Sequence, residues 1–195
     1  HIVAKEQLTI NPYSAPSMIL ENSKQSNIEI TSPTVLNNDR KYLIISNDMF
    51  NIEFDKQNGY LTKYEVNGVN MLKEGAVLKP NFWRAPTDND FGAKIHQKYI
   101  VWKKPEIKLK SFEQHIENKQ VCIEAVYEMP DVSSKLSLTY VINNKGAIKV
   151  TQKIVTSKET KISNMFRFGM QMQMPHSFET IEYYGRGPME NYSDR

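Results

Sequence analysis

Residues 135–156 read KLSLTYVINNKGAIKVTQKIVT, and apolar and polar residues alternate on both sides of a turn-forming sequence, Asn143 to Gly146. The even-numbered residues from Leu136 to Ile142 are apolar, while Ser137 and Thr139 between them are polar. Successive side chains of a strand point to opposite faces, so this pattern predicts strands with one buried face. The stretch therefore predicts an antiparallel hairpin that covers a core.

The same pattern extends outward from this hairpin toward both ends of the chain. Asn-Gly pairs at 58–59 and 67–68 favour type I′ hairpin turns, in which both central residues have positive φ. A short helix is expected at 94–103, where Ile95, Tyr99 and Trp102 would share a face. Strands are expected at 2–10, 28–30, 42–46, 49–54, 60–66, 107–116, 120–129, 135–142, 147–156, 163–174 and 180–184. Long strands in hairpin order without a βαβ rhythm predict an all-β antiparallel sandwich.

Composition excludes several classes of function. Of the 195 residues, 24% are charged and 39% hydrophobic, which is typical of a folded domain. The 25 basic residues are scattered among 22 acidic ones, so no nucleic-acid partner is expected. No apolar stretch approaches the ~20 residues that span a bilayer, so no membrane partner is expected either. Cys122 is the single cysteine and is expected to be a buried thiol.

The segment NFWRAPTDNDFG, residues 81–92, is the most unusual local sequence and is expected to be irregular. One interpretation is a structural loop in which Asp88 and Asp90 accept backbone hydrogen bonds and Arg84 pairs with one of them. Another is a sugar-facing loop, where an aromatic ring stacks on the sugar and carboxylates or amides bind hydroxyls. Asp88 and Asp90 as a pair of catalytic carboxylates is a third interpretation, although nothing nearby indicates a raised pKa.

Metal and nucleophile motifs do not fit the sequence. An EF-hand loop starting at Asp88 would need a glutamate at the twelfth position, which is Tyr99 here. The histidines lack partners at metal-binding spacing, and Ser133 and Ser134 lack a GxSxG elbow. No metal motif and no nucleophile are therefore predicted, and an isolated metal ion held by two carboxylates and backbone carbonyls is the remaining alternative.

A second dense motif, YYGRGPMENYSDR, closes the chain at residues 183–195. Its glycines and proline indicate a rigid corner in which the charged residues pair with one another. The chain starts at His1 without a methionine and stops directly after this motif, so we expect a piece of a longer protein.

Both motifs resemble those of the β-galactosidases of glycoside hydrolase family 2, in their C-terminal small-chain domain. The first is matched by Phe82, Arg84, Ala85, Pro86, Asp88, Asn89, Asp90 and Gly92. The second is matched by Gly185, Gly187, Pro188, Glu190, Asn191, Tyr192, Asp194 and Arg195, which are interpreted as a structural motif. The resemblance implies an antiparallel β-supersandwich of the galactose mutarotase-like type, truncated at the C-terminus. Residues 1–41 would end an immunoglobulin-like domain with its linker, and 42–195 would begin the small-chain domain.

By this resemblance the chain is a non-catalytic accessory domain. The parent enzyme would hydrolyse terminal β-D-galactose residues with retention, using a catalytic barrel that carries its magnesium, so this piece alone would be inactive and free of cofactors. The domain would pack beside that barrel and the immunoglobulin-like domains of a homo-oligomer, in the cytoplasm or periplasm of a bacterium. Its contribution to the active-site rim or loop hinge would come from Arg84, Asp88, Asn89, Asp90 and Gly92.

Two rival functions remain open at this point. One is an autonomous carbohydrate-binding module, which would bind galactose or lactose by itself. Alternatively, the shared fold class allows an aldose 1-epimerase with His96 or His176 as the acid and a glutamate as the base.

Overall fold

A computed structural model describes residues 34–36, 41–157 and 163–180. The expected strands at 2–10 and 28–30 lie outside the described residues, as does the expected strand at 180–184 apart from Thr180. The second motif at 183–195 lies outside them as well. Within the described residues, no helix is both long and apolar enough to cross a membrane.

The first sheet is an antiparallel meander of five strands that follow one another in chain order. Its strands are β1 (Thr34–Leu36), β2 (Tyr42–Ser46), β3 (Phe50–Asp55), β4 (Tyr60–Val66) and β5 (Val69–Asn70). Three of them match the expected strands to within a residue. The first lies in the stretch that the sequence analysis assigned to the linker, and it pairs with β2 along its whole length.

The two Asn-Gly turns of this sheet differ in conformation. Asn67 and Gly68 both have positive φ, 50° and 77°, as the type I′ prediction requires. Among Lys56 to Gly59, only Gly59 has positive φ, so the type I′ prediction was wrong for that turn. The Asp55 carboxylate accepts hydrogen bonds from the Gln57 backbone and the Asn58 side chain, at 2.8 and 3.0 Å. These bonds stabilise a longer, four-residue loop instead.

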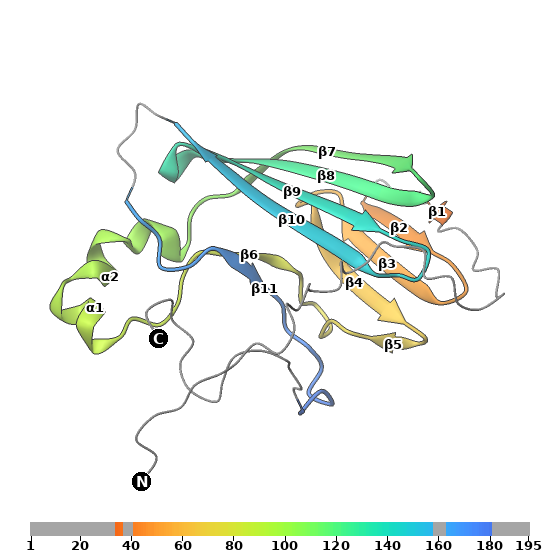
Figure 1. Cartoon of the computed structure of the whole chain (residues 1–195), viewed down its shortest axis with the longest axis horizontal. Coiled ribbons are helices and arrows are strands. Elements are labelled where there is room, and N and C mark those ends of the chain that lie inside the picture. Colours follow the sequence, from red (N-terminus) through yellow and green to blue (C-terminus); the bar gives the residue numbers. More distant parts are fainter. Residues whose placement is uncertain (1–33, 37–40, 158–162, 181–195) are drawn as a thin grey trace, which may run out of the picture.

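The second sheet contains the four longest strands, in the order β10-β9-β8-β7. They are β7 (Lys108–Glu117), β8 (Gln120–Met129), β9 (Ser134–Ile142) and β10 (Ile148–Thr156), and each lies within one residue of its expected bounds. Figure 1 shows this sheet lying across the first one. The expected all-β antiparallel sandwich is therefore confirmed.

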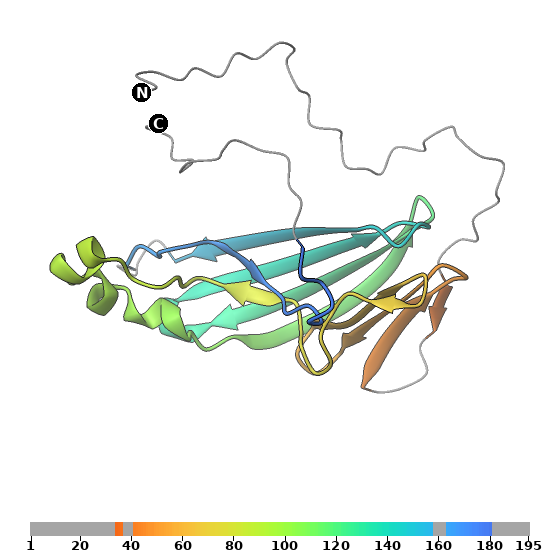
Figure 2. The same ribbon diagram turned by 90° about the horizontal axis from the view of Figure 1, so that it is seen from below.

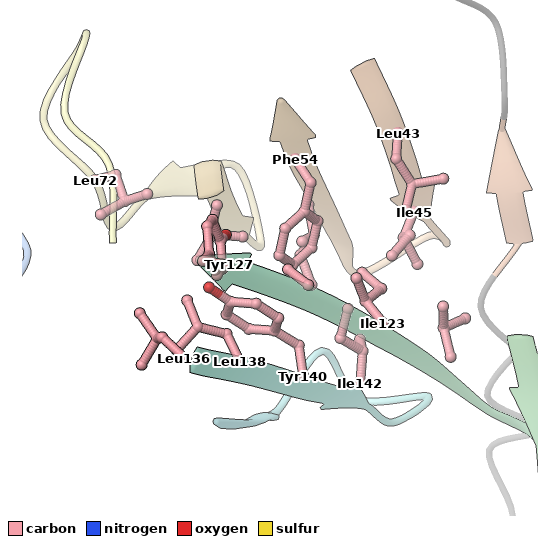
Figure 3. Packing of buried hydrophobic residues seen from close by; sticks show 14 of the residues in the cluster. Leu43, Ile45, Phe54, Leu72, Ile123, Tyr127, Leu136, Leu138, Tyr140 and Ile142 are labelled. Atoms are coloured by element: carbon pink, nitrogen blue, oxygen red, sulfur yellow. The ribbon is translucent and has the colours of Figure 1, made fainter. Parts of the chain in front are cut away.

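The core lies between the two sheets, where their inward side chains meet (Figure 3). In β9 the buried positions alternate as the sequence pattern predicts, with Leu136, Leu138 and Tyr140 fully buried. Phe54 of the first sheet meets the Tyr140 ring edge-on, with centroids 4.9 Å apart. Burial of such side chains stabilises the fold by about 1.5 to 3 kcal/mol each.

Residues 163–174 do not form the single strand that was expected. Only β11 (Gly169–Gln171) forms a strand within this stretch, and it pairs with β6 (Lys79–Asn81) in a separate two-stranded sheet. The aromatic residues preceding it pack on the segment after β6, with Phe168 stacked on Phe82 at 6.0 Å between ring centroids. Side-chain packing therefore sets the path of this segment more than strand pairing does.

The helix expected at 94–103 is broken into short pieces, and helical structure begins earlier. The pieces are α1 (Asp88–Gly92), α2 (Ile95–Lys98) and the 3-10 turn η1 (Ile100–Lys103). Lys94 between α1 and α2 has a positive φ of 54°, which a continuous helix does not allow. Residues 88–92 were expected to be irregular, and that expectation was wrong. Figures 1 and 2 place α1 and α2 at one end of the sandwich, opposite the tip of the β7–β8 hairpin.

Candidate functional site

The NFWRAPTDNDFG segment leads from β6 into α1 and is anchored at its start by the Asn81 side chain. Asn81 Oδ1 accepts a hydrogen bond from the Trp83 backbone at 3.1 Å, which turns the chain out of the strand. As a result Phe82 enters the core, with 2% of its surface exposed. It meets Trp102 edge-on at 5.4 Å between ring centroids.

A second aromatic group forms around Phe166, which lies on the segment before β11. Trp83 and Tyr99 each meet the Phe166 ring edge-on, at centroid distances of 4.8 and 5.4 Å. The guanidinium of Arg84 lies over the same ring, 4.7 Å from its centroid. Trp83 is therefore held in a packing cluster and does not present a free ring to a sugar.

Arg84 also binds Asp90, as the structural interpretation of the segment predicted. Nη1 of Arg84 lies 2.6 Å from Oδ2 of Asp90, and Nη2 lies 3.4 Å from Oδ1. Asp90 is buried, with only 7% of its surface exposed, whereas Arg84 is partly exposed. Charge-assisted pairs of this kind are short and fix the geometry of both side chains.

The Asp90 carboxylate also closes the start of α1. It accepts hydrogen bonds from the backbone N–H of Thr87 at 2.7 Å and from the Thr87 hydroxyl at 3.1 Å, in the manner of a capping box. The hydrogen bond from Arg84, followed by that from the Thr87 backbone, lowers the pKa of Asp90 from 3.8 to about 2. We call residues 87–92, held in this way, the capped turn.

The opposite side of the capped turn faces solvent. Asp88 and Asn89 are exposed, and Phe91 has 52% of its surface exposed. The Phe91 ring packs against His96, with centroids 4.7 Å apart. Gly92 ends α1, and an added Cβ there would meet no atom within 4 Å. The turn thus presents a carboxylate, an amide and an aromatic ring on a fixed backbone.

This geometry argues against Asp88 and Asp90 as a catalytic pair. A glycosidase of this kind keeps one carboxyl protonated, which requires a raised pKa. The pKa of Asp90 is lowered, and both of its oxygens already accept hydrogen bonds. The absence of catalytic residues remains a prediction for the chain as a whole.

The histidines of the epimerase hypothesis do not flank a common pocket among the described residues. His96 packs on Phe91, and its Nδ1 lies 3.5 Å from the backbone oxygen of Asp90. The His176 side chain is 99% exposed, with Nε2 3.5 Å from the Glu179 carboxylate. Neither position encloses a sugar.

An open groove of about 670 Å³ lies at the end of the second sheet where β8 leads into β9. Its walls include Lys110, Glu128, Lys135 and Val155. Tyr127 is the aromatic residue of its lining, and only 1% of Tyr127 is exposed because the ring points into the core. The groove therefore offers no aromatic face on which a sugar would stack.

Three side chains of types that can ligate metals lie close together, and the sequence motifs did not predict this group. His115, Glu117 and Cys122 have ligand atoms that all lie within 4.8 Å of one another. Their spacing in the sequence follows no metal motif, because two strands contribute to the group. Only the pairing of those strands reveals it.

The fold and this motif define the class of the chain as a two-sheet antiparallel β-domain with an ion-paired and capped turn. The chain belongs to the family described as "Beta galactosidase small chain", which matches residues 46–195.

Several curated proteins named "Beta-galactosidase" are similar to this chain. The one from Priestia megaterium is 33% identical over 162 residues, covering 78% of this chain and 15% of that protein. Those from Psychromonas ingrahamii and Lactobacillus delbrueckii subsp. bulgaricus are 30% and 29% identical, each covering 75% of this chain. The chain spans about 15% of the length of these relatives.

Proposed function

We propose that this chain acts as an accessory domain within a retaining β-galactosidase that removes terminal β-D-galactose residues. The family and the relatives support this proposal, and the small share of the relatives' length that the chain spans supports a role beside a separate catalytic barrel. Immunoglobulin-like domains of the same polypeptide are the other partners expected from the resemblance.

The capped turn is the part of the domain that we propose for the active-site rim. The observation that carries this step is the contrast between its two sides: Arg84 and Thr87 hold Asp90, while Asp88 and Asn89 are exposed. A fixed backbone keeps the exposed carboxylate and amide in place at little entropic cost on binding, which suits recognition of sugar hydroxyls.

Magnesium is proposed for the catalytic barrel and not for this turn. Mg²⁺ demands near-ideal octahedral geometry from oxygen ligands. Here the Asp90 oxygens are already taken by Arg84 and Thr87, which leaves Asp88 as the remaining carboxylate of the turn. The residues of the turn do not fit a magnesium site.

Steady-state kinetics of the full-length enzyme test the rim proposal. We expect Asp88→Ala to lower kcat/KM for lactose by about tenfold, which corresponds to about 1.4 kcal/mol of transition-state binding. Arg84→Met should lower kcat/KM to a similar extent, because it removes the ion pair with Asp90 that holds the capped turn in place. Glu74→Ala, at another exposed acidic residue, is the matched control and should change nothing. Unchanged kinetics in both rim variants would contradict the rim proposal without affecting the accessory role.

The isolated chain tests the accessory role itself. It should not hydrolyse an aryl β-galactoside, should give no heat with galactose or lactose in calorimetry, and should not speed galactose mutarotation in polarimetry. Hydrolysis abolished by Asp88→Asn or Asp90→Asn would overturn the proposal. Sugar binding would favour a carbohydrate-binding module, and mutarotation would favour an epimerase.

A further inference from the structure

The β7–β8 hairpin ends in a two-residue turn that determines how its strands pair. Asn118 and Lys119 both have positive φ, 50° and 61°, which is the type I′ conformation. This turn fixes the register of the strands, so Glu117 pairs with Gln120 and His115 pairs with Cys122.

This register brings three different metal-binding groups to one face of the hairpin. His115 and Glu117 are two residues apart on β7, so they share a face, and Cys122 lies directly opposite His115. His115 Nε2 lies 3.9 Å from Glu117 Oε2, and the ligand atoms of all three residues lie within 4.8 Å of one another. Bonds of about 2.0 to 2.3 Å in a tetrahedral zinc site place ligand atoms about 3.5 Å apart, so side-chain movements of about 1 Å suffice.

The charges on this face favour a cation. The next pair on the same face of the hairpin is Glu113 opposite Glu124, and like charges directly opposite each other are destabilising. Glu117 adds a third carboxylate near the tip of the same hairpin. A divalent cation bound at the tip would relieve part of this repulsion.

We propose that His115, Glu117 and Cys122 bind a zinc ion. A sulfur, a nitrogen and a carboxylate oxygen form a ligand set that suits Zn²⁺ and is unsuited to Mg²⁺ or Ca²⁺. The Cys122 thiol is buried, while the side chains of His115 and Glu117 are 60% and 67% exposed, so the fourth position is open to water. On binding, the Cys122 sulfur forms a bond to zinc and its proton passes to the solvent.

The zinc site is separate from the rim proposed above. The hairpin tip and α1 lie at opposite ends of the sandwich (Figures 1 and 2). The ion would fix the tip of the longest hairpin, and the site requires no particular activity of the parent protein. Failure of one proposal would leave the other standing.

Cobalt substitution tests the ligand set in the unaltered chain. Co²⁺ bound through a thiolate produces a charge-transfer band in the near ultraviolet, and we expect one such band per chain, which zinc removes by competition. Absence of the band at saturating cobalt would overturn the proposal, because Cys122 is the only cysteine.

Calorimetry with zinc tests the individual ligands. We expect one zinc ion per chain, and at least a tenfold loss of affinity in His115→Gln, Glu117→Gln and Cys122→Ser, since even partners outside the ligand shell cost 10–100-fold. His115 and Glu117 are exposed, so their variants should keep the fold. His176→Gln is the matched control, because His176 and Glu179 form an exposed pair that has no third ligand among the described residues. An equal loss in His176→Gln, or none in the three ligand variants, would contradict the proposal.

Discussion

Gly59 shows how a single residue connects the two sheets. It has a φ of 74°, in the region that favours glycine, and an added Cβ would lie 2.4 Å from the Tyr127 hydroxyl of the opposite sheet. The neighbouring Tyr60 ring stacks on Tyr127, with centroids 5.6 Å apart. The β3–β4 turn is therefore packed directly beneath β8.

We predict that Gly59→Ala lowers the free energy of unfolding by about 2 to 4 kcal/mol, because backbone strain and overpacking add. Gly68→Ala is the control: its φ is 77°, but an added Cβ would meet no atom within 4 Å, so we expect about 1 to 2 kcal/mol. Urea denaturation measures both values. Equal losses would show that the contact with Tyr127 contributes nothing.

At this scale the type I′ conformation was predicted correctly for the turn at Gly68 and wrongly for the turn at Gly59. Both follow asparagine, which is a local signal for a turn. The Asp55 side chain changes the turn at Gly59, and Tyr127 crowds it from a strand far along the sequence. The Asn-Gly pattern alone predicts neither the hydrogen bonds of Asp55 nor the contact with Tyr127.

Among the short elements, the capped turn should lose stability in acid, because its carboxylate becomes protonated there. The pKa of Asp90 is lowered from 3.8 to about 2 in the folded chain, so its carboxylate stabilises the turn above pH ~4. We predict that this contribution is lost as the pH falls from about 4 to 2, seen as faster hydrogen exchange of the Thr87 amide beyond the intrinsic pH effect.

Two variants test this origin of the acid response. Asp90→Asn should show fast Thr87 exchange already at neutral pH and no further change down to pH 2. Asn89→Ala, on the exposed side of the same turn, should keep the transition of the parent chain. A transition that survives in Asp90→Asn would assign the response to another carboxyl.

The elements also show which parts of the fold are encoded locally. Strands β7 to β10 were predicted to within a residue because they are long and bounded by turn-forming residues, and β9 alternates over its whole length. The prediction failed at 163–174 and 94–103, where aromatic contacts with Phe82 and the positive φ of Lys94 determine the path. The Arg84–Asp90 pair was anticipated, whereas the His115–Cys122 pair depends on strand register.

At the scale of the whole molecule, large apolar side chains remain exposed along one segment. Phe168, Met172, Met174 and Phe178 have 49%, 47%, 39% and 38% of their surface exposed. Exposed apolar side chains that gather in this way mark surfaces that associate.

We predict that the isolated chain self-associates as its concentration rises, and that the double variant Met172→Lys/Phe178→Lys does so much less. Sedimentation velocity across a concentration series measures this. Val69→Lys/Ile100→Lys is the control, since it removes two apolar side chains that are at least as exposed, 49% and 55%, elsewhere on the molecule. A chain that stays monomeric throughout, or a control that is equally effective, would contradict the prediction.

The aromatic packing beside the capped turn contains both tryptophans of the chain, so their fluorescence can be used to follow this region. Its two tryptophans are Trp83 and Trp102, and both contact residues around the NFWRAPTDNDFG segment. Trp102 is 1% exposed and donates a hydrogen bond from Nε1 to the Ser163 backbone oxygen at 3.1 Å, while the Lys103 ammonium lies over Trp83. Tryptophan fluorescence, excited selectively over that of the tyrosines, therefore reports on this end of the sandwich. Emission should shift when Arg84 is replaced and stay constant when zinc is added.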